Sequence, residues 1–259
     1  MAEPLVRLVR DGVVATVTLD RPAKLHSLTP PMLDELERCA RALDADPAVR
    51  VVLLTASGER AFCVGADIHE WAALQPLDMW RRWVRRGHQV FDQWARLRQP
   101  VITALNGHAF GGGLELAITG DIRLCAEHAQ FALPEASIAT CPGWSGTQRM
   151  VQLVGASRTK YLALSGMRLT AGEALAGGLV HEVLPSAELM ARAQALAQDM
   201  AAKAPVSLQL TKQLVNAAAG EDAASTLEAI AGALAASTED AAEGLRSFRE
   251  KRPAVYVGR

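Results

Sequence analysis

Two short runs of mostly apolar residues constrain the fold of this chain most strongly. Val49 to Thr55 and Val101 to Asn106 are short enough to be buried strands and rich in β-branched residues. A glycine-containing loop, Ser57 to Asp67, and a long helical stretch from about Leu77 to Arg98 separate them. Because a strand buried on both faces must be covered by other elements, we predict an α/β protein in which a parallel or mixed sheet carries outer helices.

The rest of the chain fits this alternation. Leu5 to Val9 and Val13 to Leu19 flank Asp11-Gly12, which predicts a hairpin. Thr29 precedes two prolines and an apolar stripe, so it should cap a helix that ends before Asp46-Pro47. A short helix after Gly113 and further strands at Ile122 to Ala126 and Phe131 to Leu133 repeat the order of strand, strand and helix. From Pro185 onward the sequence is Ala-rich and predicts helices.

Composition excludes several classes of protein. The 259 residues suit one large domain, with or without an appended element, and 50% of them are hydrophobic. With 27 basic and 28 acidic residues the net charge is −1, which argues against nucleic acid or an anionic membrane as the main partner. Four dispersed cysteines indicate neither a disulfide framework nor a zinc site, and no apolar run could form a signal peptide or a membrane span. We therefore expect a cytoplasmic protein.

A cluster of glycines is the most distinctive local feature. Asn106 to Leu116 contains Gly111-Gly112-Gly113 after an apolar strand and at the start of a helix. Free N–H groups at a helix start suit an anion or a developing oxyanion, whereas a tight turn with close packing would also require glycine. The cluster alone favours neither explanation. It lacks the Gly-Lys-Ser/Thr ending of a phosphate-binding loop and the GxGxxG spacing.

Two carboxylates lie near these glycines in the sequence. Glu115 falls in the first turn of the expected helix, where the helix dipole alone would favour an acid. Glu135 follows Phe131 to Pro134 and precedes a loop with Pro142, Gly143 and Gly146. Carboxylates on separate elements can act as an acid and a base on one substrate if they converge, which spacing alone does not establish.

Other catalytic and binding motifs are absent from the sequence. The six histidines form no HExxH pattern or metal-ligand cluster, and Ser145 misses the GxSxG spacing by one residue, so a zinc enzyme and a serine hydrolase are disfavoured. Four tryptophans between Trp71 and Trp94 suit a helix packed by large side chains better than a ligand pocket. The arginine pairs between Arg81 and Arg86 suit a solvated helix face.

As a whole, the chain resembles the crotonase superfamily, the enoyl-CoA hydratase/isomerase family. The resemblance extends from about Val13 to Val257 and includes six motifs in family order. They are Asp20 to Leu28, Ala61 to Ile68, Asn106 to Leu116, Phe131 to Glu135, Pro142-Gly143 with Gly146 to Arg149, and Phe248 to Pro253.

The resemblance implies a fold and an assembly. The family fold is an α/β spiral of strand-strand-helix turns, followed by a helical C-terminal trimerisation region. We accordingly expect residues 1–184 to form a spiral core that binds acyl-CoA, and residues 185–259 to serve in oligomerisation and to cover the active site. The expected assembly is a homotrimer or a dimer of trimers.

The resemblance also implies an activity. The backbone N–H groups of Ala66 and Gly112 would form the oxyanion hole for a thioester carbonyl. Both family glutamates are present as Glu115 and Glu135, the pattern typical of hydratases. Glu115 would activate water for attack at C3, and Glu135 would protonate C2. The activity would then be enoyl-CoA hydration, a step in fatty acid metabolism, with no metal and no cofactor apart from the CoA of the substrate itself.

Further positions in the family motifs would bind the substrate. Around the acyl group and CoA these are Lys24, Leu25, Arg60, Asp67, Ile68, Gly143 and Trp144, with Phe248 and Lys251 often supplied by an adjacent subunit.

Three departures from the family pattern bear on the activity. His26 replaces the usual Asn, His69 replaces a Lys or Arg, and Trp144-Ser145 replaces a pair of small residues. The first two bear on CoA contacts, and Trp144 could narrow the acyl pocket or serve packing only.

Alternatives to hydration are another crotonase reaction, such as double-bond isomerisation or thioester hydrolysis, and a non-catalytic RNA-binding homologue. The glutamate pair and the net charge of −1 weigh against the last of these.

Overall fold

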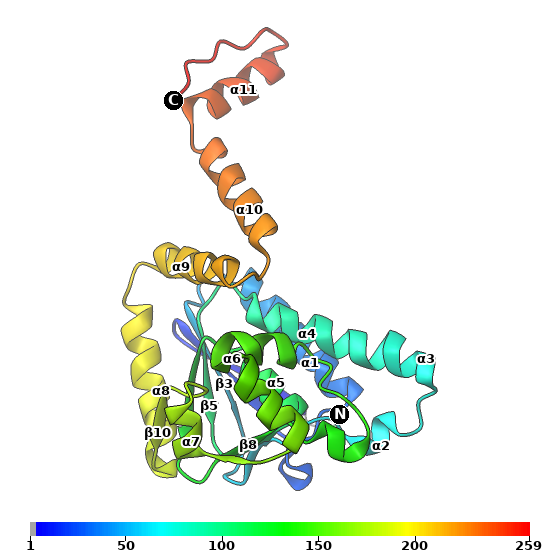
Figure 1. Cartoon of the computed structure of the whole chain (residues 1–259). Coiled ribbons are helices and arrows are strands. Elements are labelled where there is room, and N and C mark those ends of the chain that lie inside the picture. The colour runs from blue at the N-terminus through cyan, green and yellow to red at the C-terminus, as the bar shows by residue number, and fades with distance from the viewer. Residues whose placement is uncertain (1–3) are drawn as a thin grey trace. The chain divides into compact units, whose positions relative to one another are not determined.

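The computed structural model describes residues 4–259, which fall into two compact units (Figure 1). The first unit ends at Gln209, and the second extends from Leu210 to Arg259.

Two sheets form the centre of the first unit. Within residues 4–259, six strands pair in the order β1-β2-β3-β5-β7-β10 and four in the order β4-β6-β8-β9. The larger sheet consists of β1 (Val6–Asp11), β2 (Val14–Leu19), β3 (Val51–Ala56), β5 (Val101–Leu105), β7 (Ile122–Ala126) and β10 (Glu182–Leu184). The smaller consists of β4 (Ala61–Cys63), β6 (His108–Phe110), β8 (Gln130–Ala132) and β9 (Leu169–Thr170). Successive strands from β3 to β8 alternate between the sheets, and a helical segment follows each pair. This is the predicted spiral.

Helices surround these sheets and make up the C-terminal quarter. The first unit contains the short turns η1 (Pro22–Lys24) and η3 (Glu135–Ile138), a π-helical segment η2 (Met79–Val84), and α1 (Pro30–Ala45), α2 (Ile68–Trp71), α3 (Pro76–Asp78), α4 (Arg85–Ala95), α5 (Gly112–Ala117), α6 (Gly146–Ser165), α7 (Ala171–Ala176) and α8 (Ser186–Ala201). The remaining helices are α9 (Pro205–Ala218), α10 (Ala223–Ala236) and α11 (Glu239–Glu250). Among residues 4–259, no helix has both the length and the apolar character to cross a membrane.

The local predictions for the N-terminal elements are confirmed. Strands β1 and β2 pair antiparallel, and Gly12 has the positive φ, 57°, that the turn between them requires. Thr29 caps α1 by accepting a hydrogen bond from the Met32 N–H at 3.4 Å. The expected helix from Leu77 to Arg98 is present but changes its winding, since η2 precedes α4.

The central strands β3 and β5 of the larger sheet are buried on both faces, as their apolar runs predict. Val51 and Leu53 of β3 pack in one cluster with Ala193 and Ala197 of α8, whereas Val52 and Leu54 belong to the main core on the opposite face. Successive strand residues point to opposite faces, so one strand supplies both layers. Helix α8 lies along the strands in Figure 1. It thus packs within the first unit, and the assignment of residues 185–259 to oligomerisation stays a prediction.

The topology brings three loops to one edge of the smaller sheet. Strands β4, β6 and β8 are neighbours and run parallel. The loop Gly65 to Asp67 follows β4, the glycine cluster follows β6, and Pro134-Glu135 follows β8. Because ligand sites of α/β proteins lie at the carboxyl ends of parallel strands, this edge is the expected place for a site.

Candidate active site

A cavity of about 250 Å³ lies at this edge. It is lined by both glutamates, both predicted oxyanion-hole residues and a largely apolar wall. The lining residues are Val64, Gly65, Ala66, Ile68, Trp71, Met79, Trp83, Val84, Gly111, Gly112, Glu115, Pro134, Glu135, Ser137, Ile138, Thr140, Cys141, Gly143 and Trp144. Segments as far apart in the chain as Val64 and Trp144 therefore converge on one space, which sequence spacing could not establish.

The backbones of Ala66 and Gly112 lie close together. A Cβ atom built on Gly112 would lie 3.6 Å from the Ala66 N atom. Gly112 opens α5, so its N–H has no acceptor within the helix. The loop that carries Ala66 is fixed to Leu28, whose N–H donates to the Gly65 carbonyl and whose carbonyl accepts from the Asp67 N–H, both at 2.8 Å. Two backbone donors thus meet at the cavity wall, an arrangement that suits an oxyanion.

Close approach explains why glycine occupies this segment. Gly111 has a positive φ of 51°, and a Cβ atom on Gly113 would lie 2.0 Å from the Cys63 carbonyl oxygen. A Cβ atom on Gly112 would lie 2.9 Å from the ring of Trp144. Close packing, one of the two explanations open from the sequence, is therefore confirmed for these residues, and the anion site stays a prediction.

Glu115 is held by the backbone of a loop. Its side chain is buried, and its Oε1 accepts hydrogen bonds from the N–H groups of Trp144 and Gly146, each at 2.9 Å. Burial raises the pKa of Glu115, while hydrogen bonds from Trp144, Gly146 and Gly143 partly offset this by stabilising the ionised form. The carboxylate is therefore oriented and supplied with donors that favour its charge.

Glu135 has a different environment. It begins η3 and is buried. Glu135 is therefore not an acid on a loop surface, which its sequence position alone would also permit. Among the described residues its Oε2 atom has no hydrogen-bond partner. Burial, together with the negative charge of Glu115, raises the pKa of Glu135 to about 7. A carboxyl group in such a site can hold and release a proton near neutral pH.

Trp144 both lines the cavity and packs in the core. It is 3% exposed, and the Trp83 and Phe91 rings lie with centroids 5.3 Å from its own. A Cβ atom on Gly87 of α4 would lie 2.2 Å from Trp144 Nε1. Gly87 and Gly112 therefore provide the space for an indole where the family usually has a small residue.

The other predicted binding residues of the first unit lie in different places. Ile68 lines the cavity, but Asp67 turns to Arg21 in an ion pair of 2.7 Å. Leu25 and Arg60 line a separate depression of about 390 Å³. Lys24 is exposed. Their roles in binding stay predictions.

Phe248 and Lys251 lie in the second unit. Phe248 belongs to α11 and is 84% exposed, and Lys251 follows the helix as its C-cap. Their contribution to a site also stays a prediction.

The two histidine departures differ in structure. His26 is buried, where its Nδ1 accepts from the Arg21 N–H at 3.0 Å and its Nε2 lies 2.9 Å from the Ser57 carbonyl. It therefore braces the first motif from inside. His69 is exposed on α2.

Sequence reasoning missed two residues that shape the site. Ser145 has a left-handed backbone with φ 73°, although it is not glycine. Asp92 of α4 accepts a hydrogen bond from the Ser145 hydroxyl at 3.0 Å. The departure at Ser145 was a signal in the sequence, but nothing in the sequence relates it to a residue 53 positions earlier.

Comparisons with known proteins identify the family of this chain. The family model described as enoyl-CoA hydratase/isomerase matches residues 10–259. The short-chain-enoyl-CoA hydratase of Clostridium acetobutylicum is 37% identical over 95% of both chains. The crotonyl-CoA hydratase of Syntrophomonas wolfei is 33% identical over the full length of both. The crystal structure of an enoyl-CoA hydratase from Bacillus anthracis superimposes with a TM-score of 0.82 at 34% identity, covering 98% of this chain and 100% of that one. The chain therefore belongs to the enoyl-CoA hydratase/isomerase family of the crotonase superfamily.

Proposed function

We propose that this protein is an enoyl-CoA hydratase, which adds water reversibly across the C2=C3 double bond of an enoyl-CoA thioester. The observation that carries the proposal is the convergence of Glu115 and Glu135 on one cavity beside the N–H groups of Ala66 and Gly112. Relatives named short-chain-enoyl-CoA hydratase and crotonyl-CoA hydratase support it.

The two backbone donors would stabilise the charge that develops on the thioester oxygen. When water attacks C3, the electron pair of the double bond moves toward the carbonyl and gives an enolate. Donors fixed by the Leu28 bridge and by the start of α5 need little reorganisation at that moment. One such donor is worth about 3 kcal/mol of the barrier.

The glutamates would divide the proton transfers. Glu115, with backbone donors that favour its ionised form, accepts a proton from water as the new C3–O bond forms. Glu135, whose pKa of about 7 keeps a proton available near neutrality, delivers it to C2 as the enolate collapses. This assignment uses both carboxylates and favours hydration over isomerisation or thioester hydrolysis. The proposed chemistry requires no metal ion and no cofactor apart from the CoA of the substrate.

An assay with crotonyl-CoA and a longer enoyl-CoA tests the proposal. We predict that Glu115→Gln and Glu135→Gln each lower kcat by roughly 10²- to 10⁴-fold, the effect of removing general acid or base catalysis. Loss of enoyl-CoA absorbance gives the rates, and circular dichroism checks folding. Glu188→Gln, on the exposed side of α8, is the matched control and should retain full activity. Near-normal hydration by either cavity variant would contradict the mechanism.

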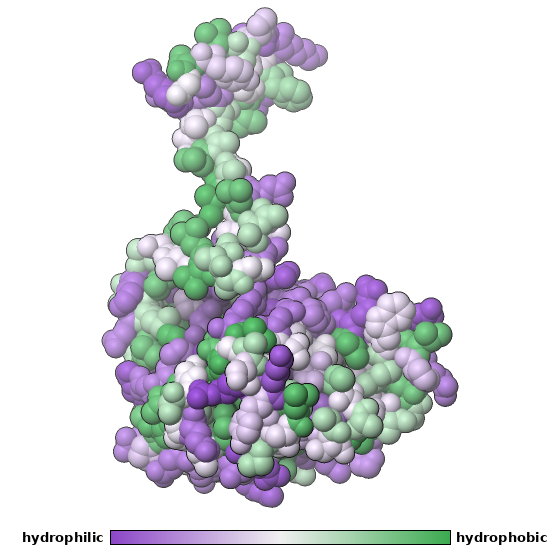
Figure 2. Space-filling model, in the orientation of Figure 1, coloured by the Kyte–Doolittle hydropathy of each residue, from purple (hydrophilic) through white to green (hydrophobic). Residues whose placement is uncertain are grey.

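We also propose that the protein acts as a homotrimer or a dimer of trimers in the cytoplasm. The second unit supports assembly because it exposes large apolar side chains, some of them visible in Figure 2. On α10 and α11 these are Leu227, Leu234, Leu245 and Phe248. In such an assembly Phe248 and Lys251 would come from an adjacent subunit.

A further inference from the structure

The loop that holds Glu115 contains an unfavourable backbone conformation. Trp144 and Gly146 direct their N–H groups at the same oxygen of the Glu115 carboxylate, and Ser145 between them adopts φ 73° and ψ 9°. A residue with a Cβ atom costs free energy in this left-handed region. Ser145 is also the N-cap of α6, but its side chain makes no capping hydrogen bond there. Something other than the helix must therefore stabilise this conformation.

Asp92 of α4 makes the contact that stabilises the left-handed conformation of Ser145. Its Oδ1 atom accepts the hydroxyl of Ser145 at 3.0 Å and Nη2 of Arg149 at 2.9 Å. Arg149 is 4% exposed and lies in the first turn of α6. One carboxylate oxygen thus connects α4 to the left-handed residue and to the helix that follows it.

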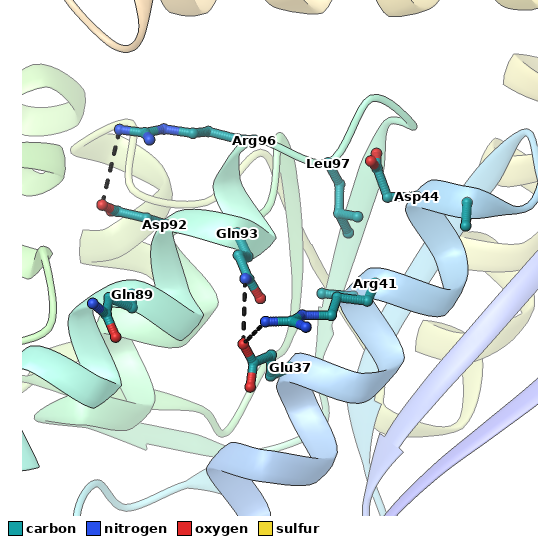
Figure 3. Close-up of a pocket in the computed structure, with 10 residues that line it drawn as sticks. Glu37, Arg41, Asp44, Gln89, Asp92, Gln93, Arg96 and Leu97 are labelled. Carbon is teal, nitrogen blue, oxygen red and sulfur yellow. Dashed lines mark hydrogen bonds and ion pairs between the residues drawn. The ribbon is translucent and has the colours of Figure 1, made fainter. Parts of the chain in front are cut away.

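The other side of Asp92 faces outward. Its Oδ2 atom lies 3.3 Å from His88 of α4 and 3.8 Å from Arg96, the C-cap residue of that helix. Figure 3 shows Asp92 and Arg96 along the groove between α1 and α4. Burial would raise the pKa of Asp92, but the hydrogen bonds and charge of Arg149, the Ser145 hydroxyl and His88 outweigh burial and lower it. Asp92 is therefore a charged acceptor at neutral pH.

We propose that Asp92 is a positioning residue, which keeps Ser145 left-handed so that the N–H groups of Trp144 and Gly146 remain directed at Glu115. Asp92 does not line the cavity and acts through the loop. The kinetic part of this inference rests on the proposed hydratase function. The alternative is that the pair of Asp92 and Arg149 only stabilises the fold.

Replacing Ser145 by glycine distinguishes the two roles. Glycine accepts a positive φ without the Cβ cost, so Ser145→Gly removes the need for the contact. We expect Asp92→Ala to lower kcat by about 10- to 100-fold with little change in KM, as a misplaced catalytic group does. The double variant Asp92→Ala with Ser145→Gly should regain most of this loss. Asp44→Asn is the matched control, since Asp44 lines the same groove but bonds Arg98.

A pH profile gives a second readout. If Asp92→Ala removes donors from Glu115, the apparent pKa of the group that must be ionised should rise, and Ser145→Gly should reverse the rise. Glu135 of η3 and Arg149 of α6 also act on this pKa and remain in all variants. If Asp92→Ala loses activity only in proportion to its loss of thermal stability, and Ser145→Gly does not restore the activity, the proposal is overturned. A folded Asp92→Ala protein with normal kcat and pH profile would do the same.

Amide hydrogen exchange keeps the test independent of substrate. Faster exchange at Trp144 and Gly146 in Asp92→Asn, with unchanged exchange in β5, supports the positioning role even if Asp92→Ala does not fold. Unchanged exchange at both amides would refute it. If the wild-type protein hydrates no enoyl-CoA, the proposed function fails, and this exchange experiment still decides the role of Asp92.

Discussion

Glu115 and Glu135 show how local contacts give two identical side chains different chemistry. Both are buried, yet only Glu115 accepts backbone hydrogen bonds from the loop at Trp144 and Gly146. Glu135 has one oxygen without a partner among the described residues. A carboxylate with several backbone donors is suited to be a base, and a buried carboxyl group with fewer donors is suited to keep its proton.

The raised pKa of Glu135 predicts a pH-dependent cost to stability. Its folded-state pKa of about 7 exceeds its ordinary value of 4.5, so the stability it contributes is complete below pH 4.5 and is lost as pH rises through 7. Glu135→Gln is neutral at every pH and avoids the loss. We expect its free energy of unfolding, relative to wild type, to increase by roughly 1 to 3 kcal/mol between pH 4.5 and pH 8.

Denaturant unfolding at several pH values measures this difference. Glu182→Gln is a control of opposite sign, because a hydrogen bond from Arg192 lowers the pKa of Glu182. That variant should lose stability, relative to wild type, as pH rises from the lowered pKa of Glu182 to the ordinary value of 4.5, and the difference should stay nearly constant above it. A pH-independent difference for Glu135→Gln would show that its carboxyl group titrates normally in the folded protein.

At the scale of elements, the sequence predicts what depends on local pattern. The strands from Val51 and Val101, the hairpin at Gly12 and the cap at Thr29 follow from period, turn residues and capping groups over a few positions. The family motifs identify Glu115, Glu135 and the glycines. Contacts between α4 and the loop after β8 could not be predicted, because Gly87 with Trp144 and Asp92 with Ser145 are joined only by the packing of distant segments.

The fit of Trp144 against α4 gives a prediction about Gly87. A Cβ atom in Gly87→Ala would lie 2.2 Å from the indole, so the ring or the helix must move. We expect the variant to lose about 1 to 3 kcal/mol of stability by overpacking, with reduced kcat/KM because Trp144 also carries a donor to Glu115. Gly172→Ala in α7 is the matched control, since its Cβ atom would contact nothing within 4 Å.

A double-mutant cycle with Trp144→Ala tests this contact directly. Trp144→Ala alone should cost about 3 to 5 kcal/mol of stability and shift the preference toward bulkier acyl groups, because the ring forms part of the cavity wall. In the double variant the cost of Gly87→Ala should disappear, giving a coupling energy of about 0.5 to 3 kcal/mol. Additive costs would mean that the two residues do not interact.

At the scale of the whole molecule, the two units differ in what they bury. The first unit has two buried apolar clusters, one on each side of its larger sheet. In the second unit, Leu227 and Leu234 of α10 are 70% and 69% exposed. These leucines are seven positions apart and therefore share one helix face. An exposed apolar face of this kind is typical of an interface, which agrees with the proposed trimer.

Charges on that face should prevent assembly. We expect wild-type protein to sediment at three or six times the mass of one chain, and Leu227→Asp with Leu234→Asp to sediment as a smaller species. The free-energy cost of desolvating two carboxylates in an apolar interface would exceed the favourable free energy of the interface contacts. Ala229→Asp with Ala236→Asp adds the same charges to the opposite, also exposed face of α10 and should leave the mass unchanged. If the leucine variant retains the wild-type mass, α10 does not form the interface. If it dissociates and loses hydration while circular dichroism is preserved, the active site depends on a neighbouring subunit, as the expected roles of Phe248 and Lys251 require.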